Sequence, residues 1–579
     1  MGYFLKILFF GYSLIFIITN TCVCQVDYQI ILTQNNEISE AEVLIINKKL
    51  KEAQLNNEKA DYLTILPQYL AEKGYLKAVI DSTIIYGNNT FVYINIGNKH
   101  FFKAKNIEEI SRSFPEVFKK NKSLNQAYEY SKLGYFESEI IKNLENNGFP
   151  LASIYKENIS FLGDTIIFTW NINKGNRFTI SEIKLLGDVN LMPSYIKGLT
   201  RLKTGMPYSE ILINNAGNKL SDLEFANLSN TPGIKFTPSG SEIEFPLQSI
   251  KANRFDGIAG LITLPDEINN KKYRISGQLN LFLINSLSYG EHIEIKWMAP
   301  GEGSQQLNLS GEFLYILGTP IKTGYSLYIN KQDTSFILVK HRPSLAFAGY
   351  KNFDFSAFAV FESNELFQQP AIFASQNIFS ANYKKNLYGI EFGMKSGKVN
   401  HTLNEGWLFK SSLATGSRIV EKNNSQIQIP EKTTQIISES IFRYNIPVLN
   451  RSLIAATIIA NIQSGKIFLD NELYRIGGFS SLKGFDENVI KCSSFGIIEA
   501  EYRFYLAKES YLNLLANAAW IENYSNIGYY NNFPIGIAAG LHFKTKPGII
   551  SVYYALGKLQ EDNFRFNNAK IHIGFTSIF

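Results

Sequence analysis

The sequence is poor in charged residues, cysteine and histidine. Charged residues make up only 19% of the 579 residues, a low fraction for a soluble protein. With 3 cysteines and 6 histidines, neither a disulfide framework nor a metal cluster is expected. No catalytic elbow, metalloprotease helix or phosphate-binding loop stands out, so we expect no enzyme and no cofactor. The net charge of +6 includes no dense basic block, which argues against a nucleic-acid partner.

The N-terminus has the layout of a cleaved secretory signal. Lys6 precedes an apolar run over residues 7–18, and small residues follow up to Cys24, so we predict a signal peptide at residues 1–24. A membrane anchor is the alternative, but the run is shorter than the ~20 residues of a spanning helix. Lipidation is the minor alternative, because neither Cys22 nor Cys24 has an aliphatic residue three positions upstream.

Beyond this segment, no run of 18 or more apolar residues occurs, which excludes a helical membrane protein. A membrane β-barrel remains open, because its strands alternate and give only a weak hydropathy signal. Aromatic residues reach 14%, with 32 Tyr and 43 Phe. This surplus suits strands, and it also suits the aromatic girdles of a membrane barrel.

The first half of the chain repeats a unit of strand, helix, helix, strand, strand. The first copy is expected to have helices at residues 40–53 and 60–73 and a strand pair at 78–86 and 90–96. Such a sheet leaves an edge that accepts a strand from another chain, although inert spacers would read the same way. The predicted modules are residues 25–100, 101–178 and 179–250.

The second half, residues 251–579, is almost wholly strand-like. Apolar and polar residues alternate, as over 291–297, which fits either a sandwich or a barrel with a wet lumen. The length and the export signal favour the barrel, with about 16 antiparallel strands. The predicted fold is therefore α+β modules followed by an all-β transmembrane barrel. Its last strand carries an outer-membrane signal in the alternating apolar residues Ile571, Ile573, Phe575 and Phe579.

Taken together, these features resemble the BamA/TamA superfamily of outer-membrane assembly factors, whose periplasmic modules are called POTRA domains. The resemblance covers nearly the whole chain, and three modules with this length are more similar to the TamA branch. Gly74-Tyr75 and Gly205-Met206-Pro207-Tyr208 match the POTRA pattern moderately well. The resemblance implies an outer-membrane location, with the modules in the periplasm.

The most specific segment is the stretch from Arg475 to Phe485. In the family, a long extracellular loop folds back into the barrel and carries Gly-Gly, followed by Arg-Gly-Phe or Arg-Gly-Tyr at its tip. Here Lys483 replaces the usual arginine. The matching loop residues are Gly477, Gly478, Lys483, Gly484 and Phe485.

The family arginine meets carboxylates of the barrel wall, and the resemblance places such a carboxylate at Glu501. The second position falls near Asn517, which is not acidic. We therefore expect Lys483 to lie inside the barrel and to pair with Glu501, because a cation away from bulk water needs an acidic partner. A solvated surface turn is the competing interpretation.

The resemblance implies a protein that inserts others into the outer membrane. Its modules would receive unfolded outer-membrane proteins or contact a periplasmic or inner-membrane-anchored partner. Clients would then enter outer-membrane lipid at a seam between the first and last strands. The alternatives are a polypeptide translocation pore or passive channel, and a surface antigen without a transport role.

Overall fold

The computed structural model describes residues 27–32, 62–86, 89–119, 124, 126–263, 273–301, 303–348, 352–367, 380–397, 406–421, 430–465, 468–507, 509–525 and 528–579. The predicted signal peptide and the helix expected at residues 40–53 lie outside these ranges. The chain divides into two units. One comprises residues 1–181, 205–211 and 236–241, and the other comprises residues 182–204, 212–235 and 242–579.

The first unit begins with a small sheet and one described helix: β1 (Asp27–Leu32), α3 (Tyr62–Glu72), β2 (Val79–Tyr86) and β3 (Asn89–Asn95). The strand order is β1-β3-β2. Leu66 and Leu70 of α3 pack against Val92 and Ile94 of β3. The helix ends just before Gly74, whose φ of +97° is the left-handed conformation typical of a helix stop.

A second sheet of the same unit is covered by three helices. Its elements are β4 (Phe101–Ala104), α4 (Ile107–Ser113), α5 (Pro115–Phe118), α6 (Tyr130–Glu145), β5 (Ser153–Leu162) and β6 (Thr165–Asn173). The order is β4-β6-β5, which leaves β5 at an edge. Phe136 and Ile140 of α6 and Phe168 of β6 belong to one buried core.

A third sheet has the order β7-β10-β8, with β9 also paired to β10. Its elements are β7 (Ile180–Gly187), α7 (Pro193–Thr200), α8 (Glu210–Ser221), β8 (Ala226–Leu228), β9 (Gly233–Thr237) and β10 (Gly240–Ser249). Ile213 and Leu220 of α8 and Phe245 of β10 are buried. Among the residues that the structure describes, no helix is long and apolar enough to cross a membrane.

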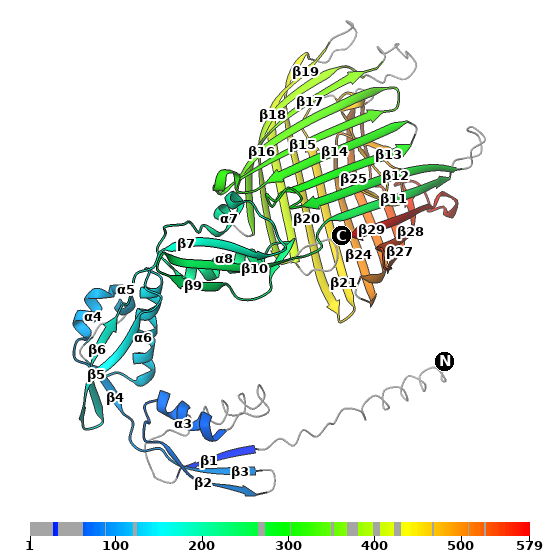
Figure 1. Ribbon diagram of the computed structural model, residues 1–579. Coiled ribbons are helices and arrows are strands. Elements are labelled where there is room, and N and C mark those ends of the chain that lie inside the picture. Colours follow the sequence, from blue (N-terminus) through cyan, green and yellow to red (C-terminus); the bar gives the residue numbers. More distant parts are fainter. Residues whose placement is uncertain are drawn as a thin grey trace, which may run out of the picture. The chain divides into compact units, whose positions relative to one another are not determined.

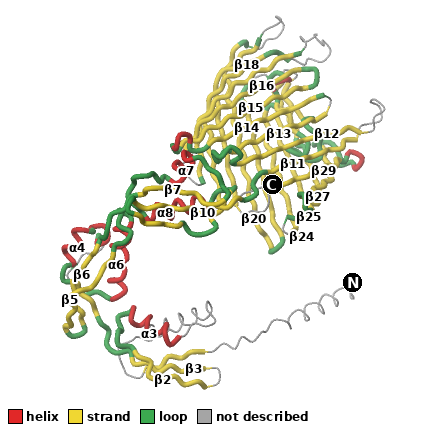
Figure 2. The backbone as a smooth tube through the Cα atoms, viewed as in Figure 1, coloured by secondary structure: helices red, strands yellow, loops and turns green. Residues whose placement is uncertain are grey.

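The remainder of the second unit is a closed antiparallel barrel (Figures 1 and 2). β26 and β27 pair with successive stretches of β25 and together count as one barrel strand, so the described residues make a barrel of 16 strands. The expected architecture of α+β modules followed by a barrel of about 16 strands is confirmed. The strands are β11 (Arg254–Thr263), β12 (Tyr273–Ile284), β13 (His292–Gly301), β14 (Ser304–Phe313), β15 (Ile321–Gln332), β16 (Phe336–Phe347), β17 (Phe353–Leu366), β18 (Tyr383–Gly397), β19 (Gly406–Val420), β20 (Lys432–Leu449), β21 (Ser452–Gln463), β24 (Ser494–Ala507), β25 (Ser510–Ser525), β26 (Gly528–Asn532), β27 (Ile535–Lys544), β28 (Ile549–Lys558) and β29 (Lys570–Ile578).

The two faces of the barrel wall differ as the sequence pattern predicts. On β29, Ile571 and Ile573 are exposed, whereas Lys570 and His572 are buried. Strand β28 follows the same rule, with Val552 exposed. An apolar outer face around a closed ring of hydrogen-bonded strands is the structure that suits a bilayer, because no backbone edge meets lipid. The barrel is therefore a membrane-spanning barrel of the outer-membrane type.

The ring closes where β11 meets β29, and we call this junction the seam. It runs from Arg254 opposite Ile578 to Leu261 opposite Ile571, eight residue pairs in all. By comparison, β18 and β19 share fifteen pairs. The seam is therefore closed and is one of the shorter junctions among the described residues, together with β12–β13 and β13–β14, which share eight pairs each, and β28–β29, which shares seven.

Candidate functional site: a loop inside the barrel

The described part of the long connection between β21 and β24, residues 464–465 and 468–493, lies against the inner wall of the barrel, and we call it the inner loop. It carries three short elements, η2 (Asp470–Glu472), β22 (Tyr474–Ile476) and β23 (Ile490–Cys492). Ile476, Leu482 and Cys492 pack in one buried cluster with wall residues of β24 and β25, including Phe495 and Ile521. A solvated surface turn would leave such side chains in water, so the inward-folded arrangement is the one observed.

Glycines allow the tip of the inner loop to approach the wall closely. Gly484 has a φ of +96°, and a Cβ there would collide with the backbone carbonyl of Leu556 on β28. On the wall, a Cβ at Gly536 would collide with the carbonyl of Lys483. Gly477 and Gly478 also have positive φ, 122° and 89°. These conformations favour glycine, so the backbone path explains Gly477, Gly478 and Gly484.

Lys483 forms its ion pair with Glu499, and the prediction of Glu501 as its partner is wrong. The distance between Lys483 Nζ and Glu499 Oε2 is 2.7 Å, and both side chains are largely buried. Lys483 Nζ also lies 5.4 Å from the ring centre of Phe479. Glu499 and Glu501 are two residues apart on β24 and point to the same face, so strand parity alone could not choose between them.

Glu501 has other partners on the wall. Its carboxylate accepts a hydrogen bond from Arg503 Nη2 at 2.5 Å and from Asn513 Nδ2 at 2.6 Å. Asn517 stands opposite Glu499 in the β24–β25 register. It is buried, and its amide approaches Gly536 beside the Lys483 carbonyl. Asn517 therefore borders the loop tip, whereas Glu501 belongs to a neighbouring wall cluster.

The loop tip also contacts the last two strands. Asp486 Oδ1 lies 2.6 Å from Lys570 Nζ on β29. The Phe479 ring packs edge-on against Tyr553 of β28 at 4.9 Å and tilts over His572 of β29 at 5.3 Å. Phe485 is partly buried in the loop cluster and borders Gly557 of β28. The inner loop therefore contacts the strand that closes the seam.

Sequence reasoning missed Glu499, Asp486 and Lys570. The only signal for Lys570 and His572 was their parity, since they alternate with the outward Ile571 and Ile573. Of the four C-terminal signal residues, Phe575 is half-buried on β29, and Phe579 follows the end of that strand. Ile571 and Ile573 are exposed, and the backbone N–H of Phe579 donates to the Asn253 carbonyl at 2.9 Å.

The modules present a second candidate surface at their sheet edges. Strand β5 is an edge strand that exposes Tyr155, Ile159 and Phe161, the last with 71% of its surface accessible. Strand β2 is also an edge and exposes Tyr86. Exposed aromatic and branched side chains beside unpaired backbone groups are the features of a strand that accepts another strand.

No family model matches the sequence, and no curated protein matches it. Solved structures do resemble it. A BamA from Haemophilus ducreyi lacking POTRA domains 1–3 is 13% identical, with 82% of this chain and 98% of that chain covered and a TM-score of 0.48.

Two further structures are CdiB proteins. CdiB from Acinetobacter baumannii is 11% identical, with coverages of 83% of this chain and 91% of that chain and a TM-score of 0.49. CdiB from Escherichia coli is 12% identical, with coverages of 94% and 100% and a TM-score of 0.49. With all three TM-scores below 0.5, the fold is assigned from the strand pairing of this chain itself.

Proposed function

We propose that this protein is an outer-membrane assembly factor that inserts unfolded client polypeptides through the seam of its barrel. Three POTRA modules at residues 25–100, 101–178 and 179–250 receive the clients in the periplasm. The barrel at residues 251–579 delivers them into outer-membrane lipid. No covalent step is involved.

The single observation that carries the proposal is the contact between the inner loop and the seam strand. Strand β29 closes the barrel through eight pairs with β11, and its Lys570 and His572 contact the inner loop. A strand held by a short ladder on one edge and by a loop on its inner face can be released by moving that loop. Both β11 and β29 would then offer free edges, and a client strand pairs with such an edge through main-chain hydrogen bonds.

The module edges support the same proposal. The exposed faces of β2 and β5 fit extended apolar segments, which unfolded barrel proteins carry in every strand. Because main-chain pairing reads little sequence, such edges suit many unrelated clients. A periplasmic or inner-membrane-anchored partner is the other occupant that we propose for them.

Crosslinking the seam tests the proposed route. Ala259 of β11 and Ile573 of β29 face one another in the register, so Ala259→Cys with Ile573→Cys can be joined in a Cys492→Ser background. We expect client insertion into membranes to stop on oxidation and to resume on reduction. The matched control joins Leu309→Cys with Leu327→Cys across β14 and β15, where a link leaves the seam free. Equal insertion by the two crosslinked proteins would contradict the seam route.

Depletion separates an assembly factor from a dedicated translocation pore. We expect several unrelated outer-membrane barrels to fall in abundance when this protein is depleted. A pore or channel with one cargo would affect that cargo alone. Quantitative proteomics of the outer-membrane fraction measures the difference.

A further inference from the structure

The inner loop has a second attachment, far from its tip. Asn471 of η2 donates its amide to Asn364 Oδ1 of β17 at 2.5 Å and to the Ala381 carbonyl at 2.9 Å. Next to it, the Glu472 carboxylate accepts a hydrogen bond at 3.3 Å from the backbone N–H of Leu469, which precedes the same helical turn. The short helical turn is therefore closed on itself and joined to a wall 107 residues away in sequence.

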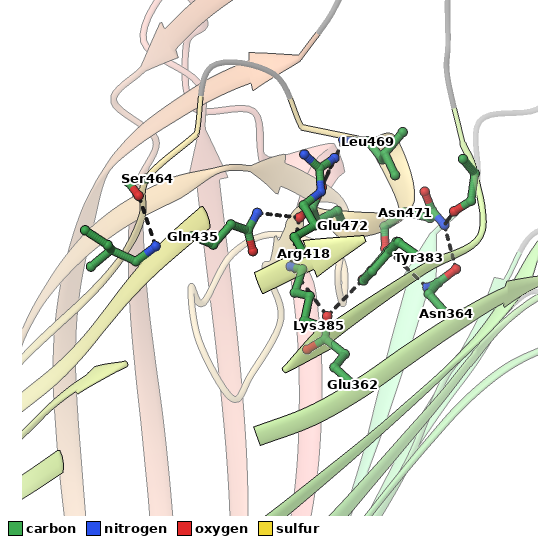
Figure 3. Close-up of polar contacts among 12 residues, drawn as sticks. Glu362, Asn364, Tyr383, Lys385, Arg418, Gln435, Ser464, Leu469, Asn471 and Glu472 are labelled. Atoms are coloured by element: carbon green, nitrogen blue, oxygen red, sulfur yellow. Dashed lines mark hydrogen bonds and ion pairs between the residues drawn. The ribbon is translucent and has the colours of Figure 1, made fainter. Parts of the chain in front are cut away.

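Glu472 is the centre of a buried charge cluster. Its carboxylate lies 2.9 Å from Lys385 Nζ of β18 and 2.8 Å from Arg418 Nη2 of β19. Gln435 of β20 donates its amide to the same carboxylate at 2.7 Å. The side chain of Glu472 is fully buried, and those of the two cations are 3% and 4% exposed. Figure 3 shows these three wall side chains converging on Glu472.

The wall alone does not balance these charges. Within ion-pair distance, the described wall strands supply two cations and one further carboxylate, Glu362 of β17, which lies 3.5 Å from Lys385 Nζ and accepts a hydrogen bond from Tyr383 at 3.0 Å. The fourth charge comes from the inner loop. Buried cations without an acidic partner are strongly destabilising. The Lys385–Arg418 pair is therefore built to receive an acid, and Glu472 is the acid that it receives.

A neighbouring cluster on the same wall makes the contrast clear. Glu391 of β18 pairs with Arg342 of β16 at 2.7 Å and with Lys410 of β19 at 3.0 Å. Here too, one carboxylate joins cations of two other strands. Its acid, however, is a wall residue, so this cluster is complete without the inner loop. Two clusters of like composition thus differ in where their acid comes from.

The place of the Glu472 cluster in the ring is also informative. In strand order, β18 and β19 are the eighth and ninth of the 16 barrel strands, whereas the seam lies between the first and the last. The tip of the inner loop contacts β24, β28 and β29, on the seam side. One attachment is therefore opposite the seam, the other is beside it, and the loop crosses the lumen between them.

We propose that Glu472 is a positioning residue that fastens η2 of the inner loop to β18–β20 and so keeps the lumen closed to ions, independently of the tip. This inference goes beyond the proposed function, because it concerns the lumen and holds whichever route a client takes. Movement of the tip with the seam strands then leaves the Glu472 attachment in place. The barrel opens sideways without becoming a pore.

The test is ion conductance of the full-length protein reconstituted in planar lipid bilayers. We expect Glu472→Gln to raise the time-averaged conductance by more than about tenfold, since removal of one partner from a buried pair greatly weakens the attachment. Glu391→Gln is the matched control and should conduct like the unaltered protein. Equal conductance of the two variants would overturn the proposal.

A chemical bridge distinguishes positioning from a general loss of structure. In a Glu472→Gln and Cys492→Ser background, Asn364→Cys and Asn471→Cys are joined by dibromobimane, which alkylates two nearby thiols. The bridge should return the conductance to the unaltered level, and a bridged protein that still conducts would contradict the proposal. If Glu472→Gln does not fold, Glu472→Gln with Arg418→Gln removes one charge of each sign and leaves Lys385 with Glu362. That variant should conduct more than the unaltered protein, and wild-type conductance would again refute the role of Glu472.

Discussion

Lys570 of β29 and Asp486 of the inner loop form an ion pair, with 2.6 Å between Nζ and Oδ1. This pair joins the strand that closes the barrel to a segment that lies inside it. One edge of the same strand is held to β11 by eight register pairs. Release of β29 therefore requires two sets of contacts to break, and only one of them belongs to the sheet.

Removing the Lys570 charge should loosen the seam. We expect Lys570→Met to weaken the interaction between the inner loop and β29 by about 1–3 kcal/mol of free energy, a range set by the partial exposure of Asp486. The measurement is the yield of the Ala259→Cys, Ile573→Cys crosslink in membranes, which should fall. Lys296→Met is the control, because the ion pair of Lys296 is with Glu294 of its own strand. A charge swap, Asp486→Lys with Lys570→Asp, should restore the crosslink yield. An equal yield in all these variants would show that the Asp486–Lys570 pair does not stabilise the seam.

The ion pair at the tip predicts which wall carboxylate matters. Lys483→Ala and Glu499→Gln should behave alike, because each removes one partner of the same ion pair. Each should weaken the binding of the loop tip to the wall by about 1–3 kcal/mol of free energy. Both variants should therefore expose the inner loop to added protease and lower client insertion. Lys483→Arg should be tolerated, because a guanidinium also pairs with a carboxylate. Glu501→Gln should leave the inner loop protected, since Glu501 pairs with Arg503. Protection lost in Glu501→Gln but kept in Glu499→Gln would reverse the assignment.

Gly484 should not accept a side chain. Gly484→Ala places a Cβ at a φ of +96° and against the Leu556 carbonyl. We therefore expect backbone strain alone to lower the stability of the folded loop by about 1–3 kcal/mol. Gly496→Ala on β24 is the matched control, because a Cβ there meets nothing closer than 3.9 Å. Heat-modifiable migration on gels and protease protection of the inner loop measure folding and loop position separately. Equal behaviour of the two variants would show that the tip does not need glycine.

The edge of the second module should bind without contributing to stability. In a fragment of residues 101–178, Phe161→Ser should weaken binding of an extended peptide from the last strand of a barrel protein. It should change the free energy of unfolding by no more than about 0.5 kcal/mol, because Phe161 is exposed. Phe168→Ala is the contrasting variant and should cost about 3–5 kcal/mol, because Phe168 is fully buried. Urea unfolding and fluorescence anisotropy measure the two effects, and unchanged binding by Phe161→Ser would exclude this edge.

Periodicity predicted the elements that depend on local pattern. The helix expected at residues 60–73 is observed as α3 (Tyr62–Glu72), and the strands expected at 78–86 and 90–96 are observed as β2 (Val79–Tyr86) and β3 (Asn89–Asn95). The alternation at the start of β29 gave Ile571 and Ile573 as outward residues, since side chains on a strand must alternate, and both are exposed.

What the sequence could not predict is the path of the inner loop across the lumen. Glu499 and Glu501 have the same parity, and the choice between them depends on where Gly484 meets β28. Glu472 lies in a segment without periodicity, and its partners Lys385 and Arg418 are on distant strands. Contacts of this kind depend on the closed ring, which no local pattern contains.

Cys492, buried in the inner loop, is the only cysteine among the residues that the structure describes. Its side chain is 0% exposed, and a thiol reacts with added reagents only when solvent reaches it. Cys492 is therefore a native probe for movement of the inner loop away from the wall. The rate at which a maleimide modifies Cys492 in intact membranes reports how often the inner loop leaves the wall, before any residue has been altered.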